Sequence, residues 1–162
     1  MRLFIAINFT EPFKKEVLGC QADLRRASLS GNFSRPENLH MTLAFIGEVR
    51  DASGALRAVK SVRFEPFELK LKGSGRFGNL WWIGADSGKK AEALAAEVRD
   101  ALRREGVPFD AKPFKPHITV AREVETAADF SMRVPEAVMT VSRISLMKSE
   151  RINGRLVYSE IK

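Results

Sequence analysis

The sequence predicts a single α+β domain that spans residues 1–162. A length of 162 residues suits one domain. Patterns typical of strands alternate with patterns typical of helices along the whole chain. No low-complexity segment divides the sequence, and a hydrophobic fraction of 44% with a charged fraction of 29% is ordinary for a globular protein. These three observations favour one compact unit of interleaved strands and helices.

The chain begins with a strand and a helix. Residues 3–7 form a short continuous apolar run, which predicts a buried central strand. Thr10 is a suitable helix N-cap, Pro12 falls in the first helical turn, and apolar residues then recur at steps of three and four as far as Ala27. We therefore expect a helix that ends near residues 28–31.

Two strands and a second helix follow. Residues 39–46 are rich in strand formers and predict a strand with two unlike faces. Asp51 is placed to cap a short helix that turns apolar residues of 52–59 inward. Residues 67–72 alternate strictly between apolar and polar types, which predicts a strand with one buried face. The glycine-rich residues 73–75 predict a turn.

The second half of the chain holds the clearest helix and a hairpin. An apolar stripe at helical spacing predicts a helix over residues 88–105, stopped by Gly106. Asn153-Gly154 is a strong hairpin turn signal. Strands are expected over residues 80–83, 114–122, 138–148 and 155–161.

The composition limits the partners and the binding sites that we expect for this protein. The net charge of +7 suits a polyanionic partner such as nucleic acid, although a solvated basic face would give the same charge. The single cysteine, Cys20, cannot form an internal disulfide, so we expect a packing residue in a cytoplasmic protein. One cysteine and two histidines are too few for a structural zinc site, and we expect no metal and no cofactor. Apolar runs shorter than about 20 residues and the lack of a leader predict no membrane association.

Both histidines of the chain lie in the same short pattern. His40 and His117 are each followed by an apolar residue, a threonine (Thr42 and Thr119), another apolar residue and an alanine. Residues two apart on a strand share a face, so each histidine shares a face with its threonine. If the two strands lie in related halves of one fold, two imidazoles and two hydroxyls converge on one surface.

Such a set suits displacement at phosphorus. A pair of imidazoles can supply both the acid and the base near neutral pH, and hydroxyls can donate hydrogen bonds to phosphate oxygens. A lone histidine on a strand is more often a packing or surface residue, and threonine is a common strand former. The duplication of the pattern favours function. Basic residues reinforce it as phosphate contacts, namely Arg35 before the first motif and Lys112, Lys115 and Arg122 around the second.

With these motifs, the sequence resembles the 2H phosphoesterases and, within them, the RNA 2′,3′-cyclic phosphodiesterases, also called LigT-like or 2′-5′ RNA ligase proteins. The resemblance extends along nearly the whole chain. It is carried by residues 1–7, 35–49, 116–122 and 146–158.

The resemblance implies a bilobal α+β fold, in which two pseudo-symmetric lobes with antiparallel sheets enclose a central cleft. It implies that His40 is the general acid that protonates the departing 3′ oxygen and that His117 is the general base that activates water. The product would be an RNA end with a 2′-phosphate, and some members also join RNA ends through a 2′-5′ linkage. Thr42 and Thr119 would hold phosphate oxygens, and Arg122 would supply charge.

Arg122 poses a geometric difficulty. It lies five positions after His117, and strict alternation turns such a residue away from the face that carries the histidine. A bulge or the end of the strand would have to redirect it.

Other readings of function stay open. The chain could be an RNA-binding module without turnover, which would bind RNA in a salt-sensitive manner. It could also act on small cyclic nucleotides or on 2′-5′ linked oligonucleotides. No feature requires a protein partner, and we expect a monomer whose partner is RNA with a 2′,3′-cyclic phosphate end.

Weaker motifs have simpler explanations. Residues 84–90 resemble a phosphate-binding loop, but their spacing is wrong, and Ser87 as a helix cap explains them better. Trp81 and Trp82 point to opposite faces, and packing is expected for both. Phe114 is a candidate to stack on a base, whereas Phe45 is expected on the core side of its strand.

Overall fold

A computed structural model describes residues 1–162, and its nine strands form two antiparallel sheets. The first sheet has the order β3-β1-β8-β9 and the second has the order β2-β6-β5-β4-β7. The strands are β1 (Arg2–Asn8), β2 (Ser28–Phe33), β3 (His40–Glu48), β4 (Phe67–Phe77), β5 (Leu80–Asp86), β6 (His117–Thr126), β7 (Val138–Val141), β8 (Ser145–Ile152) and β9 (Arg155–Ile161). The helices are α1 (Glu11–Arg26), α2 (Ser53–Ser61), α3 (Lys90–Arg104) and the single 3-10 turn η1 (Pro36–Asn38).

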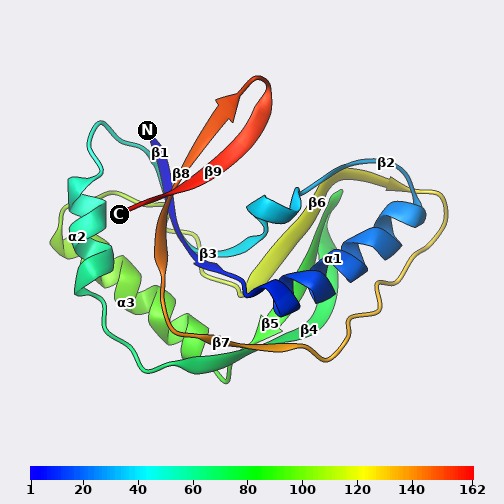
Figure 1. The fold of residues 1–162 in the computed structure, drawn as a ribbon, viewed down its shortest axis with the longest axis horizontal. Helices are drawn as coiled ribbons and strands as arrows, with labels where there is room; N and C mark the ends of the chain where they lie inside the picture. Colours follow the sequence, from blue (N-terminus) through cyan, green and yellow to red (C-terminus); the bar gives the residue numbers. More distant parts are fainter.

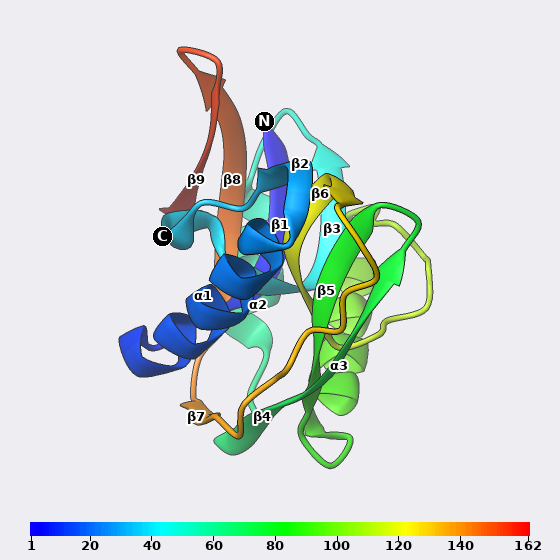
Figure 2. The same cartoon turned by 90° about the vertical axis from the view of Figure 1, so that its right-hand side faces the viewer.

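The helix that covers each sheet comes directly after a strand of the other sheet. The helix α1 follows β1 of the first sheet but packs against β2 and β6 of the second. Conversely, α3 follows β5 of the second sheet and packs against β3 of the first, together with α2. Figures 1 and 2 show α1 and α3 on opposite sides of the molecule. This exchange gives the two-lobed α+β architecture that the resemblance implies.

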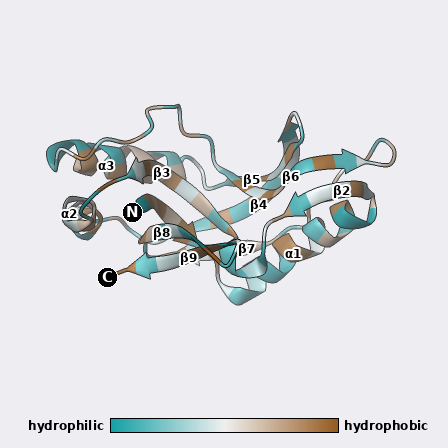
Figure 3. Cartoon of the chain, turned by 90° about the horizontal axis from the view of Figure 1, so that it is seen from above, coloured by the Kyte–Doolittle hydropathy of each residue, from teal (hydrophilic) through white to brown (hydrophobic).

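The helices pack because each has one apolar face. In α1 the buried residues Phe13, Val17, Cys20 and Leu24 recur at steps of three and four. Figure 3 shows hydrophobic and hydrophilic residues on different parts of α1 and α3. One continuous cluster of 35 buried residues draws on both sheets and all three α-helices, while Phe4, Ala6 and Met147 of the first sheet form a small second cluster.

Three sequence expectations about local structure are wrong. The helix α1 ends at Arg26, and residues 28–31, near which it was expected to end, already belong to the edge strand β2. Residues 73–75 are not a turn but the middle of the long strand β4, where a register shift accommodates the left-handed Gly73 (φ 67°) and Gly75 makes room for a tryptophan ring. The expected strand over residues 138–148 divides at residues 142–144, so β7 joins the second sheet and β8 the first.

Other expectations are confirmed. Asn153 and Gly154 both have positive φ angles, 52° and 77°, as a two-residue turn between β8 and β9 requires. Cys20 is 2% exposed. Its burial raises the pKa of its thiol to about 11, with Asp23 and Glu16 adding to the effect, so the side chain serves as a packing group.

Candidate active site

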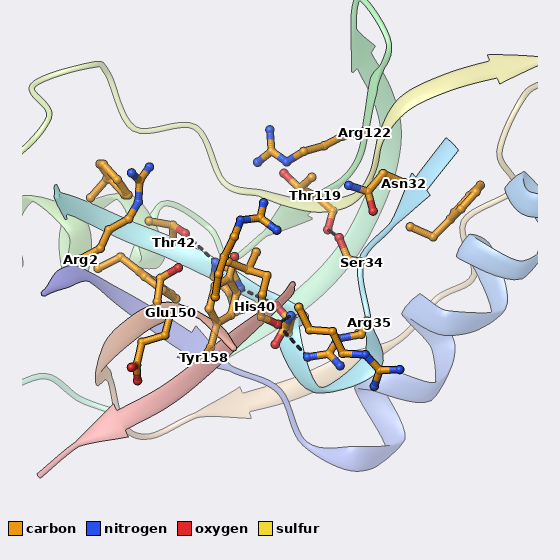
Figure 4. Close-up of a pocket in the computed structure, with 18 of the residues that line it drawn as sticks. Arg2, Asn32, Ser34, Arg35, His40, Thr42, Thr119, Arg122, Glu150 and Tyr158 are labelled. Atoms are coloured by element: carbon orange, nitrogen blue, oxygen red, sulfur yellow. Dashed lines mark hydrogen bonds between the residues drawn. The ribbon is translucent and has the colours of Figure 1, made fainter. Parts of the chain in front are cut away.

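A cleft of about 930 Å³ lies between the two sheets, and both histidine motifs line it. His40 and Thr42 come from β3 of the first sheet, while His117 and Thr119 come from β6 of the second. The two strands contact each other across the junction of the lobes. Figure 4 shows His40 and Thr42 on one strand and Thr119 on the facing side of the cleft. The sequence prediction that these four side chains share one surface agrees with the structure.

Each motif strand carries a bulge at the same step after its histidine. In β3, Ala44 pairs with Ile5 and Thr42 pairs with Ala6, so Leu43 is the extra residue. In β6, Ala121 and Thr119 pair with the consecutive residues of β5, which leaves Val120 as the extra residue. A bulge reverses the alternation of the residues that follow it.

The bulges decide which later side chains reach the cleft. Beyond Val120 the alternation of β6 is reversed, and Arg122 lines the cleft as the resemblance implies. The corresponding residue of β3 is Phe45, which also lines the cleft, so the expectation that it faces the core is wrong. The guanidinium of Arg2 lies 4.9 Å above the Phe45 ring.

Hydrogen bonds to the backbone orient both imidazoles. His40 Nδ1 lies 2.7 Å from the carbonyl oxygen of Asn38, and His117 Nδ1 lies 2.7 Å from that of Lys115. Because a carbonyl only accepts, Nδ1 carries the proton in both rings, and Nε2 of the neutral ring has a free lone pair. In His40 this Nε2 accepts a hydrogen bond from Thr42 Oγ1 at 2.9 Å.

Aromatic rings enclose His40. The Phe4 ring lies 4.8 Å from its centroid, and the Tyr158 ring meets it edge-on at 5.3 Å. Burial therefore lowers the pKa of His40 below its usual 6.5, and the positive charges of His117 and Arg122 lower it further, while the bond to Asn38 opposes the change. These surroundings favour the neutral form of the His40 imidazole.

Aromatic rings also lie beside His117. Trp82 and Phe77 lie with their ring centroids 6.4 and 6.3 Å from it. Trp81, on the other face of β5, is buried in the core as expected. Phe114, which was the expected stacking residue, packs against the core and does not line the cleft.

The basic residues near the motifs do not all reach the cleft. Arg35 and Arg122 line it, whereas the side chains of Lys112 and Lys115 do not. The sequence reasoning did not assign several lining residues. Ser34 and Asn38 lie shortly before the first motif, and the others come from more distant segments: Arg2, Asn32, Arg151, Arg155 and Tyr158. Of these, Asn38 had a local signal, since it stands two residues before His40 in the lead-in to the motif.

No group of three or more His, Cys, Asp and Glu side chains lies close enough together to hold a metal ion. No helix combines the length and the hydropathy needed to cross a membrane. Residues 84–90 run from the end of β5 to the first residue of α3. Lys89 holds the N-cap position, and Ser87 Oγ accepts a hydrogen bond from the backbone N–H of Ala91 at 2.8 Å, so Ser87 satisfies one N–H of the first helical turn.

Comparisons with known proteins point to one family. The family model described as the 2′-5′ RNA ligase superfamily matches residues 14–153. An RNA 2′,3′-cyclic phosphodiesterase of Methanothermobacter thermautotrophicus is 28% identical over 100% of this chain and 97% of its own length. One of Thermus thermophilus is 32% identical over 93% of this chain and 82% of its own. The crystal structure of E. coli LigT with 3′-AMP matches with a TM-score of 0.83 at 27% identity, covering 99% of this chain and 95% of that one.

Proposed function

The chain belongs to the 2′-5′ RNA ligase superfamily, and from this we propose that it hydrolyses the 2′,3′-cyclic phosphate at an RNA end to a 2′-phosphate. The observation that carries the proposal is the pairing of the two motifs across one cleft. Two imidazoles, each fixed through Nδ1, present Nε2 as the reacting atom from opposite lobes. A binding module has no need of two such oriented groups.

The reaction follows from these groups. His117 Nε2 takes a proton from a water molecule as its oxygen attacks the phosphorus. The bond between phosphorus and the 3′ oxygen breaks, and protonated His40 gives its Nε2 proton to that oxygen. The hydroxyls of Thr42 and Thr119 donate hydrogen bonds to the non-bridging oxygens, and Arg122 balances their charge. No metal takes part in these steps.

The assignment of His40 as the acid requires it to be charged when substrate is bound. Burial and the nearby Arg122 disfavour that charge in the free protein and lower the pKa of His40. A phosphate anion placed between the imidazoles and Arg122 reverses the balance of charge, so substrate binding itself raises the pKa of His40. The acid is thus formed in the complex.

The same groups would catalyse the same displacement with a different attacking group. If the 5′-hydroxyl of a second RNA replaces water as the attacking group, the product is a 2′-5′ linkage and the same 3′ oxygen is released. We expect this ligation only where RNA ends are concentrated relative to the competing water.

The test uses an oligonucleotide that ends in a 2′,3′-cyclic phosphate, in buffer containing EDTA. The proposal predicts turnover to a product whose phosphorus NMR spectrum shows a 2′-phosphate. Salt-sensitive binding with no turnover would favour the RNA-binding module instead. Release of a 3′-phosphate would contradict the direction of cleavage.

A further inference from the structure

The hairpin of β8 and β9 adds arginines to the cleft that the proposed reaction at the terminal phosphate does not require. Arg151 and Arg155 flank its turn, and both line the cleft together with Arg35. The proposed reaction at the terminal phosphate already has two imidazoles and Arg122. Three more guanidinium groups on the same side are therefore available to a second anion.

All three arginines adjoin Leu156. This residue follows Arg155 in the chain and pairs across the hairpin with Arg151. Its carbonyl accepts a hydrogen bond from Arg35 Nη2 at 2.7 Å. Glu37 Oε1 lies 3.3 Å from Nε of the same guanidinium, so Arg35 is held in a fixed orientation beside the hairpin.

The hairpin sets the distance of this cluster from the histidines. Tyr158, which meets the ring of His40, pairs with Ser149 in the hairpin ladder. Arg151 lies two residues beyond Ser149 on the same face, which is about 7 Å along the strand. The cluster thus extends from His40 toward the hairpin turn, which projects beyond the body of the molecule (Figures 1 and 2).

Of the three arginines only Arg35 is paired with a carboxylate, that of Glu37, and the acidic residues that line the cleft do not neutralise Arg151 and Arg155. Glu48 lies 3.2 Å from the N-terminal amino group and Glu150 lies 3.4 Å from Lys148. Arg151 has only a 3.5 Å contact with the carbonyl oxygen of Gly154, and neither it nor Arg155 forms a salt bridge. Exposed arginines without a carboxylate partner are suited to phosphate, which matches their paired donors.

We propose that Arg35, Arg151 and Arg155 form a second anion site that binds the phosphodiester on the 5′ side of the terminal nucleotide. This inference rests on the proposed function. It makes the preferred substrate an oligonucleotide end, and it assigns that preference to the hairpin. A nucleoside 2′,3′-cyclic phosphate has no such phosphodiester and leaves the site empty.

The test measures kcat/KM of the wild type and of the variant Arg151→Ala/Arg155→Ala on two substrates, a short oligonucleotide and a mononucleoside, both with 2′,3′-cyclic phosphate ends. The inference predicts that the wild type prefers the oligonucleotide and that the double variant loses about tenfold or more of that preference. The slope of log affinity for the oligonucleotide against log salt should also fall by about 0.7, because one phosphate contact is lost. Arg35 is kept, because its bond to Leu156 also fastens the hairpin.

Arg63→Ala is the matched control. Arg63 is exposed, forms no salt bridge and lies outside the cleft, so its loss removes one charge without touching either proposed site. An unchanged preference in the double variant, or an equal loss on both substrates, overturns the inference. If the wild type opens neither substrate, the proposed function itself fails.

Discussion

The environment of His40 differs from that of a solvated histidine, because its ring is buried among aromatic side chains. Its pKa lies below 6.5 because burial disfavours the imidazolium. As the pH falls through 6.5, the unfolded chain binds a proton that the folded protein binds only at lower pH, so the free energy of unfolding decreases. Above 6.5 both states are neutral at this position and the penalty is absent. Urea unfolding at pH 7.5 and 5.5 should show a smaller decrease for His40→Gln than for the wild type.

An NMR titration checks the same group directly. The C–H resonances of the His40 ring should titrate below pH 6.5 in the free protein and at higher pH when inorganic phosphate fills the cleft. A pKa above 6.5 in the free protein would contradict the account of its burial.

Replacing Thr42 by valine or by serine distinguishes the contribution of its hydroxyl from that of its packing. Its hydroxyl bonds His40 Nε2 in the empty cleft and is proposed to turn to a phosphate oxygen in the complex. Thr42→Val removes the hydroxyl at nearly constant volume, and it should lower kcat/KM for a cyclic phosphate end by about tenfold to a hundredfold. Thr42→Ser should retain most of the activity. Equal losses in both variants would show that packing, not the hydroxyl, is what matters.

At the scale of elements, the sequence indicated that the alternation of β6 must break, but it could not show at which residue the bulge lies. The spacing of His117 and Arg122 showed that one strand with strict alternation could not present both. Only the pairing with β5 shows that Val120 is the extra residue. Phe45 was misplaced for the same reason, since the bulge at Leu43 depends on pairing with β1 rather than on a local pattern.

The pairing of β4 and β5 depends on a close approach at Gly84. A Cβ at this position would lie 2.4 Å from the carbonyl oxygen of Lys72, a backbone atom that cannot move aside. Gly84→Ala should therefore destabilise the protein by about 1–3 kcal/mol, measured by urea unfolding. The matched change Gly19→Ala lies in α1, where nothing is within 4 Å of the added Cβ, and it should stabilise the protein by about 0.5–1 kcal/mol. A neutral Gly84→Ala would contradict the close approach of the two strands.

At the scale of the whole molecule, the sequence predicted the kinds of elements better than their partners. The apolar runs and stripes identified β1, β3, α1 and α3, because those patterns record local burial. They could not show that α1 covers the second sheet, or that β7 and β8 belong to different sheets. Those choices depend on contacts between segments distant in the chain.

The candidate site divides in the same way. Its two histidines and two threonines repeat a short pattern and were found from it. Tyr158 and the hairpin arginines reach the cleft only because β8 pairs with β1. No local sequence pattern predicts that pairing. Local sequence therefore identified the groups proposed to react, and the fold added their surroundings.

The central claim is that His40 and His117 act together as acid and base. It is tested most directly by kcat/KM, in EDTA, of His40→Ala, His117→Ala and the double variant on an oligonucleotide with a 2′,3′-cyclic phosphate end, after circular dichroism shows that each is folded. The account predicts a loss of about 10³-fold or more in each single variant and little further loss in the double variant, because the groups act as a unit. Activity within tenfold of the wild type in either folded single variant would contradict it.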